Sequence, residues 1–243
     1  TNGTGDGSSW VNATNSIQGA IDVIETTSAT NTVAVSNGVY NTGGYTGYPG
    51  GFNTVRRREA IYKAITVRAA SSDPADTIIK GAPANAGDPD FPNGTGAVRC
   101  VWMTNGASLI GFTLTNGWTG AVHTQPNSGL RGGRVYCGTG GAVWDASISN
   151  CVIVGNRSWY QGGGATHGSL YDCLIAFNTS GGQGVAPEDE SLYQGSAGGG
   201  GTFASSAYRC TIVSNRSFWK GAGGGMQMRN GANSNNAVDC YIA

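Results

Sequence analysis

A short motif that recurs along the chain constrains the fold more than any other feature. It contains a Cys, any residue, an Ile, and an Asn three positions after the Ile. The motif occurs at 151–156, 173–178 and 210–215, and it begins again at Cys240. Self-similarity at a short period is typical of a solenoid, in which each coil buries its apolar face only by stacking on its neighbours. The repeat therefore predicts stacked coils.

The Cys and the Ile of each motif are expected to point into the solenoid. Successive side chains of a strand point to opposite faces, so these two residues share one face. The residue between them varies in polarity, which favours a position on the outside. The predicted interior stack comprises Cys151, Cys173, Cys210, Cys240, Ile153, Ile175, Ile212 and Ile242.

The motif Asn is expected to turn the chain. The segment 108–117 aligns with the first motif and places Gly117 over Asn156. Gly and Asn share a tolerance of positive φ, and stacked amides can also hydrogen-bond along the axis as a ladder. The predicted turn residues are Asn156, Asn178, Asn215 and Gly117.

One amphipathic helix is predicted near the N-terminus, at about 16–25. Its apolar residues recur at i, i+3, i+4 and i+7 from Ile17, and Asn15 with Gln18 resembles a capping box. Such a helix can cover the apolar end of a stack and its first unpaired strand.

We expect a single domain over 1–243, with 1–31 as the N-terminal cap region and 32–243 as the coils. The intervals between motif Ile residues are unequal, which indicates insertions. Loops on a rigid scaffold are where solenoids usually place function. The expected insertions lie near 41–58, 82–97, 118–139, 179–197 and 226–237.

Composition excludes some partners and indicates where the protein acts. The formal net charge is zero, so the basic footprint of a nucleic-acid binder is missing. No apolar run reaches the roughly 20 residues that cross a bilayer, so the chain is not expected to span a membrane. Few Lys residues and many Gly, Asn and Thr residues favour an extracellular or cell-surface protein.

Two local patterns carry a family resemblance. Gly140-Gly141-Ala142-Val143 and the Ile-x-x-Asn motif, together with an opening that runs from Asp6 to Tyr40, resemble the right-handed parallel β-helix proteins of the pectin-lyase-like superfamily. The nearest likeness is to bacterial surface proteins of the polymorphic outer membrane protein type, whose repeats read G-G-A-aliphatic and F-x-x-N. The resemblance implies an all-β, single-stranded right-handed parallel β-helix with a short N-terminal capping α-helix.

The resemblance implies no single activity, because the superfamily includes lyases, hydrolases, adhesins and structural proteins. Its lyases hold Ca²⁺ with clustered acids and use an Arg as base, and its hydrolases use several Asp residues with G-H-G and R-I-K segments. Neither set occurs in this chain, where Thr166-His167-Gly168 is the nearest approach. We therefore assign no catalytic residues.

The acidic run Glu188, Asp189 and Glu190 lies in the longest expected insertion. Its carboxylates could ligate Ca²⁺, although such a run is more often a solvated loop. His123 and His167 have no partner at ligand spacing. Apart from this Ca²⁺ hypothesis, the sequence implies no metal and no cofactor.

Aromatic residues follow two of the motif Asn residues, as Trp159 with Tyr160 and as Phe218 with Trp219. Exposed rings can form a contact patch for sugars or proteins. We favour the alternative, in which they pack on the loop of the adjacent coil.

The stacked Cys residues allow two interpretations. Adjacent parallel strands lie close enough for disulfides between rungs, whereas interior Cys is also a good small apolar residue. We favour buried thiols.

These features together favour a structural protein without catalysis: an extracellular or cell-surface scaffold, adhesin, or self-assembling subunit of a filament or surface layer. The last motif breaks off at 240–243 without its Asn. An uncapped coil is a template for another strand, so three explanations are open: the natural chain continues, another segment covers the end, or another copy packs on it. Head-to-tail contact between copies yields open filaments when it does not close. Expected partners are copies of itself, or a surface polysaccharide or glycan. The alternative is a polysaccharide lyase or hydrolase, or a carbohydrate-binding β-helix module.

Overall fold

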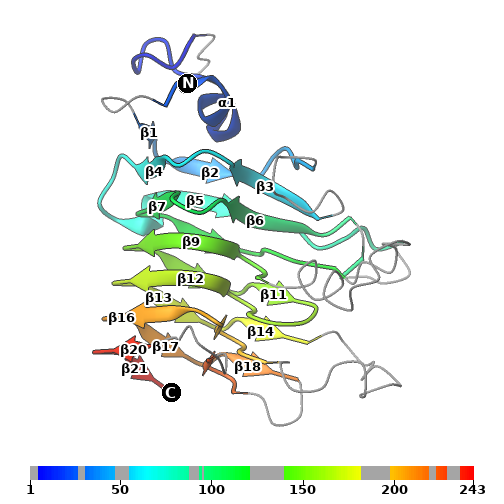
Figure 1. The fold of residues 1–243 in the computed structure, drawn as a ribbon. Coiled ribbons are helices and arrows are strands. Elements are labelled where there is room, and N and C mark those ends of the chain that lie inside the picture. Colours follow the sequence, from blue (N-terminus) through cyan, green and yellow to red (C-terminus); the bar gives the residue numbers. More distant parts are fainter. Residues whose placement is uncertain are drawn as a thin grey trace.

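The chain folds mostly into parallel β-sheet, with one short α-helix near its N-terminus (Figure 1). The structure is a computed structural model and describes residues 5–26, 31–46, 55–87, 93–94, 96–120, 140–181, 198–218, 223–228 and 236–243. The prediction of a β protein with a short N-terminal helix is confirmed.

The first sheet holds eleven of the described strands, and all its strand pairs are parallel. Its main path is β1 (Thr32–Val35), β4 (Thr66–Ala69), β7 (Ser108–Ile110), β9 (Val143–Ser149), β12 (Ala165–Tyr171), β15 (Thr202–Phe203) and β19 (Met226–Gln227). Beside this path lie β3 (Arg56–Ile61), β6 (Val98–Met103), β16 (Ser206–Tyr208) and β20 (Ala237–Val238).

Two further parallel sheets complete the stack. The second sheet has the order β2 (Gly38–Tyr40), β5 (Thr77–Lys80), β8 (Thr113–Thr115), β10 (Val152–Val154), β13 (Leu174–Ala176), β17 (Thr211–Val213) and β21 (Tyr241–Ile242). The third sheet consists of β11 (Arg157–Ser158), β14 (Thr179–Ser180) and β18 (Arg216–Ser217). A 3₁₀ turn, η1 (Pro74–Asp76), precedes β5.

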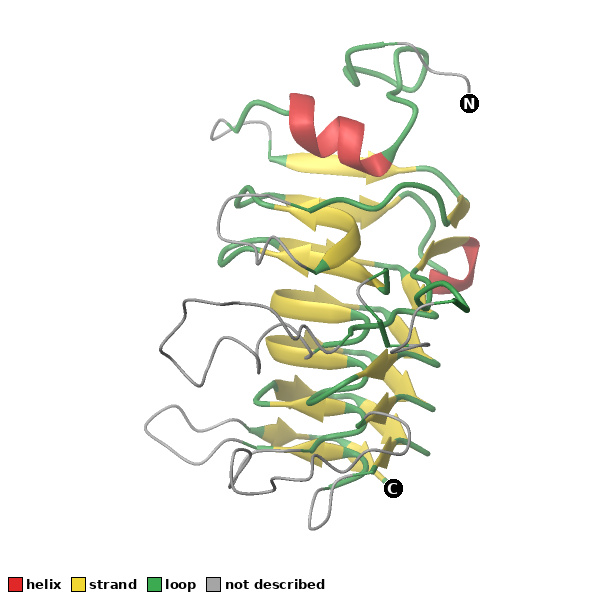
Figure 2. Ribbon diagram, turned by 90° about the vertical axis from the view of Figure 1, so that its right-hand side faces the viewer, coloured by secondary structure: helices red, strands yellow, loops and turns green. Residues whose placement is uncertain are grey.

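Strands of the three sheets alternate along the chain, so that β9, β10 and β11 are followed by β12, β13 and β14 in the same order. Each strand pairs with the equivalent strand of the next round without a shift in register. Ile153, for example, lies opposite Leu114 on one side and Ile175 on the other. Figure 2 shows the strands stacked along one direction, with the helix over one end.

The core consists of apolar columns that run through the stack. The described residues include one continuous apolar cluster that extends from Ile17 to Ile212. One column belongs to the first sheet and contains Val33, Val67, Leu109, Ile148, Leu170 and Ala207. The second sheet contributes Ile79, Leu114, Ile153, Ile175 and Ile212. Full burial of one such Leu or Ile side chain contributes about 1.5–3 kcal/mol.

Helix α1 (Ile17–Val23) covers β1 and β3 and buries Ile17 and Ile21. Its N-cap is Ser16, whose hydroxyl accepts a hydrogen bond from the Gly19 N–H at 3.0 Å. The predicted capping box of Asn15 and Gln18 is therefore wrong. The Gln18 side chain faces β3 instead, where it accepts from the Ala60 N–H at 2.7 Å and donates to the Ala60 carbonyl at 3.2 Å.

Some expected insertions contain strand residues. Strand β3 begins at Arg56, inside the insertion expected near 41–58, and β14 and β19 occupy the first residues of those expected near 179–197 and 226–237. Arg57 and Arg58 fit into the buried strand β3 because main-chain carbonyls accept from their guanidinium groups, those of Val55 and Lys80 among them. Large parts of the expected insertions, 121–139 and 182–197 in particular, lie outside the described residues.

The helices among the described residues are all too short to cross a membrane.

Candidate functional site

The motif Asn residues form a ladder of side-chain amides. Asn156 Nδ2 donates to Asn178 Oδ1 at 2.9 Å, and Asn178 Nδ2 donates to Asn215 Oδ1 at 3.0 Å. The same oxygens accept from the backbone N–H groups of Asn156 and Asn178. Asn156 and Asn178 are buried. Each amide therefore joins its own coil to the next one.

Gly117 occupies the position of Asn156 one coil earlier, and its N–H donates to Asn156 Oδ1 at 2.8 Å. A Cβ atom at Gly117 would overlap the Gly141 carbonyl oxygen and lie 2.9 Å from both Asn156 Oδ1 and Cys100 Sγ. Gly is therefore required at this position because the space beside its Cα is filled.

The left-handed turn lies one residue before the predicted position. Positive φ occurs at Gly155 (66°), Phe177 (55°) and Ser214 (54°), each directly before a motif Asn. The Asn itself points its amide into the ladder, and the preceding residue reverses the chain. The prediction that the turn residues themselves have positive φ is wrong for all four, Asn156, Asn178, Asn215 and Gly117.

A second left-handed column lies directly before the motif Cys, at Asn150 (49°), Asp172 (54°), Arg209 (51°) and Asp239 (52°). These residues are exposed. Arg209 and Asp172 form a bidentate ion pair of 2.7 and 2.8 Å, with side chains 59% and 50% exposed. The pair lies on the surface, at the corner between the first two sheets. Exposed ion pairs of this kind contribute little to stability.

The predicted interior residues line the stack, except at its last described coil. Ile153, Ile175 and Ile212 are fully buried, whereas Ile242 is 45% exposed. Cys151, Cys173 and Cys210 are buried and Cys240 is half-buried.

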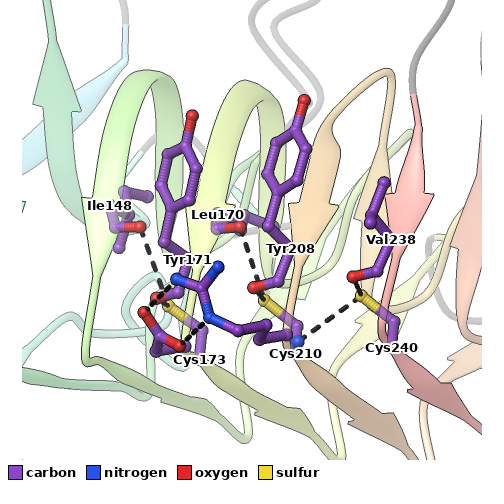
Figure 3. Close-up of polar contacts among 10 residues, drawn as sticks. Ile148, Leu170, Tyr171, Cys173, Tyr208, Cys210, Val238 and Cys240 are labelled. Carbon is purple, nitrogen blue, oxygen red and sulfur yellow. Dashed lines mark hydrogen bonds and ion pairs between the residues drawn. The ribbon is translucent and has the colours of Figure 1, made fainter.

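The four motif Cys residues form a column of free thiols, three of which are drawn in Figure 3. Each Sγ donates to the carbonyl oxygen two residues earlier, at 3.2 or 3.3 Å. The Sγ atoms of Cys151 and Cys240 also accept the N–H of Phe112 and Cys210 from the neighbouring coil, at 3.4 Å. Burial raises the pKa of Cys151 to about 11, and a hydrogen bond with Cys210 together with burial raises the pKa of Cys173. The same hydrogen bond lowers the pKa of Cys210 to about 6, but its thiol is buried away from solvent, so the column suits a structural role.

A row of rings and guanidinium groups lies along the outside of the third sheet. We call it the arginine–aromatic strip and define it as Trp118, Arg157, Phe218 and Arg216. The guanidinium carbon of Arg157 lies 5.5 Å from the Trp118 ring centroid and 5.4 Å from the Phe218 ring centroid. The guanidinium carbon of Arg216 lies 4.2 Å from the Phe218 centroid. Such cation–π contacts hold each guanidinium plane in place.

Strand register explains why the strip forms. Trp118 bridges to Arg157, which pairs with Thr179, which in turn pairs with Arg216. Residues that pair in register on parallel strands point to the same side of the sheet. Arg216 is exposed, Phe218 is 47% exposed, and Trp118 and Arg157 are half-buried, so solvent reaches the strip.

The strip carries the positive charges of Arg157 and Arg216, and its environment disfavours the charge on Arg157. Burial and the nearby Arg216 charge both lower the pKa of Arg157. Its Nη2 donates to the Gly181 carbonyl at 3.3 Å, whereas its buried Nε has no hydrogen-bond partner. The carboxylate of Asp172 pairs with Arg209 and not with the strip.

Two of the four predicted contact aromatics are less exposed than Phe218. Tyr160 is buried and Trp159 is half-buried, while Trp219 lies outside the described residues. The sequence contained a signal for the strip that the prediction of contact aromatics did not use. Asn-Arg-Ser occurs at both 156–158 and 215–217, so an Arg follows two ladder amides at the same position.

The predicted Ca²⁺ candidates Glu188, Asp189 and Glu190 lie outside the described residues, as does His123. The described residues bring no three His, Cys, Asp or Glu side chains together in a group that could hold a metal ion. The His167 ring lies 6.2 Å from the Trp144 ring and 6.0 Å from the Phe203 ring, in an aromatic row on the first sheet.

A pocket of about 750 Å³ lies at the other end of the stack, between the N-terminal segment, α1 and strands β1 and β2. Its lining is mainly apolar and small polar, and its titratable residues are Asp6, Glu25 and Tyr40. This pocket lies at the opposite end of the stack from the arginine–aromatic strip. The strip carries two guanidinium charges and is therefore the candidate site.

Comparison of the chain with protein-family models, with curated proteins and with solved structures gives no match.

Proposed function

We propose that the chain is a right-handed parallel β-helix of the pectin-lyase-like kind, and that its role is structural. Three parallel sheets whose strands alternate along the chain support this assignment. Right-handed crossover is the rule for parallel strands in one sheet, which favours the same hand here.

The observation that carries the scaffold role is the amide ladder. Buried Asn side chains bond coil to coil at 2.9 and 3.0 Å, in line with unbroken Ile and Cys columns. Every buried polar atom of the ladder is satisfied only when the neighbouring coil is in register, so the ladder stiffens the stack along its axis. A stiff rod that carries loops is suited to a scaffold, an adhesin, or a subunit of a filament or surface layer.

The proposed location is extracellular or at the cell surface, on the strength of the Gly, Asn and Thr-rich composition. The proposed partners are copies of the same chain, which can add parallel strands to an edge of a sheet. Electron microscopy and light scattering over a range of concentrations test this proposal. Rods that lengthen with concentration are expected, and a compact monomer at every concentration would contradict self-assembly.

The second candidate function is polysaccharide binding or cleavage, and the solvent-accessible arginine–aromatic strip favours its binding form. Incubation with pectin, alginate and related polysaccharides tests cleavage. New unsaturated ends or reducing sugars would replace the structural proposal with an enzymatic one.

A further inference from the structure

Each guanidinium group of the arginine–aromatic strip lies against at least one aromatic ring. The ring of Phe218 lies against both Arg157 and Arg216, and the ring of Trp118 lies against Arg157. A guanidinium group binds oxyanions through the N–H groups at its edge, in the plane of the fork. Contacts with the rings restrict the guanidinium groups and so reduce the entropy that is lost when these groups bind an anion.

Charge in the strip is uncompensated within the described residues. Arg157 and Arg216 lie against the same ring, and the Arg216 charge adds to burial in lowering the pKa of Arg157. The Arg157 Nε atom is buried without a hydrogen-bond partner, and the cation–π contacts are the interactions that hold Arg216. An anion beside the two groups would relieve the electrostatic repulsion on Arg157.

Two guanidinium groups, those of Arg157 and Arg216, can bind more anion oxygens than one carboxylate offers, which favours a tetrahedral anion. A carboxylate has two oxygens and matches one guanidinium fork, whereas a sulfate half-ester has three free oxygens and can accept from two guanidinium groups at once. Strand register also places Arg157 and Arg216 two strand spacings apart, which is about 10 Å along the stack. The strip thus runs along the stack, in the direction in which a polymer chain would lie.

We propose that the arginine–aromatic strip is a binding site for the sulfate half-esters of a sulfated glycan. The exposed Phe218 ring gives the sugar an apolar surface beside the charged groups. This site does not depend on the scaffold role, because a rigid rod and a ligand-binding surface can coexist on the same coils.

Binding of the full chain to three dextrans tests the proposal: dextran sulfate, carboxymethyl-dextran of equal charge density, and neutral dextran. The measurement is isothermal titration calorimetry at 0.15 M salt, where charges separated by more than about 8 Å are largely screened. We expect dextran sulfate to bind, neutral dextran not to bind, and carboxymethyl-dextran to bind at least about tenfold more weakly.

Three variants locate the binding. Arg216→Gln should weaken dextran sulfate binding about tenfold or more, since it removes a charged hydrogen-bond donor. Arg216→Lys keeps the charge but not the fork, and should recover only part of the loss. Arg209→Gln is the matched control, because Arg209 is also an exposed Arg but already pairs with Asp172. It should bind like the unaltered chain.

Several outcomes would overturn the proposal. If dextran sulfate does not bind, the site does not exist. If Arg209→Gln and Arg216→Gln lose the same affinity, or if Arg216→Lys recovers all of it, the attraction is nonspecific. Equally tight binding of carboxymethyl-dextran, or of poly-glutamate, would replace the sulfated glycan with a carboxylate ligand or an acidic peptide. Arg216 is exposed, so unchanged thermal unfolding is expected in each variant and excludes misfolding as the cause.

Discussion

The side-chain amide of Asn178 donates to Asn215 Oδ1 at 3.0 Å, and its own oxygen accepts from the side-chain amide of Asn156 at 2.9 Å. Asn178 also donates to the Ile153 carbonyl at 2.8 Å. A single buried side chain thus connects three coils, and its removal would leave several buried donors and acceptors without partners.

Asn178→Ala should lower the free energy of unfolding by about 2–5 kcal/mol, because each unsatisfied buried polar group costs about 1–3 kcal/mol. Urea denaturation measures the change. The exposed Asn41→Ala is the control and should change stability by less than about 0.5 kcal/mol. Equal small effects at the two positions would show that the amide ladder contributes nothing to stability.

Glu59 should make the N-terminal end of the stack sensitive to pH. This carboxyl is buried in β3, near Arg58 of the same strand and Asp22 of α1, and its Oε2 has no hydrogen-bond partner. Burial raises its pKa from 4.5 to about 8. Between these values the folded chain holds a proton that the unfolded chain has released, so the contribution of Glu59 to stability falls as pH rises from about 4.5 to 8.

Glu59→Gln should therefore leave stability nearly unchanged at pH 4 and increase it by about 2–5 kcal/mol at pH 9, where the buried carboxylate is charged. Urea denaturation of both proteins at the two pH values measures the difference. The exposed Glu25→Gln is the matched control. A Gln variant that is less stable than the unaltered chain at pH 9 would contradict the assignment of Glu59 as a buried, unfavourable charge.

The four buried Cys residues should remain as thiols that react only after unfolding. Cys100, Cys151, Cys173 and Cys210 are buried, and burial raises the pKa of Cys100 to about 12. Intact mass after alkylation should show these four unmodified in the native chain and modified in denaturant without reductant. Half-buried Cys240 should react first. If alkylation in denaturant requires a reductant, the column contains disulfides.

The interior columns could be predicted from the sequence because they depend on local alternation. Ile153 and Ile175 fall at the same point of a short repeat, and repeats of a solenoid stack in register. Strand β3 could not be predicted in this way, because Arg57 is buried by partners that are distant or irregular, such as the Trp102 ring at 5.5 Å. The arginine–aromatic strip likewise depends on Phe218, which lies two coils beyond Arg157.

The position of the left-handed turn allows a test by glycine substitution. Gly155 has φ of 66°, and a Cβ atom there would contact only Thr115 Oγ1, at 3.8 Å. Space for the Cβ atom is therefore available. Gly155→Ala should lower the free energy of unfolding by about 1–2 kcal/mol, because only the left-handed backbone disfavours Ala there.

Gly87→Ala provides the comparison. Gly87 has no atom within 4 Å of its Cβ position and no positive φ, so Ala there should be neutral or slightly stabilising, because it reduces the entropy of the unfolded chain. Thermal or urea unfolding of both variants measures the difference. If Gly155→Ala is as stable as Gly87→Ala, the chain does not need a left-handed residue before Asn156, and the turn would have to be assigned to the Asn itself.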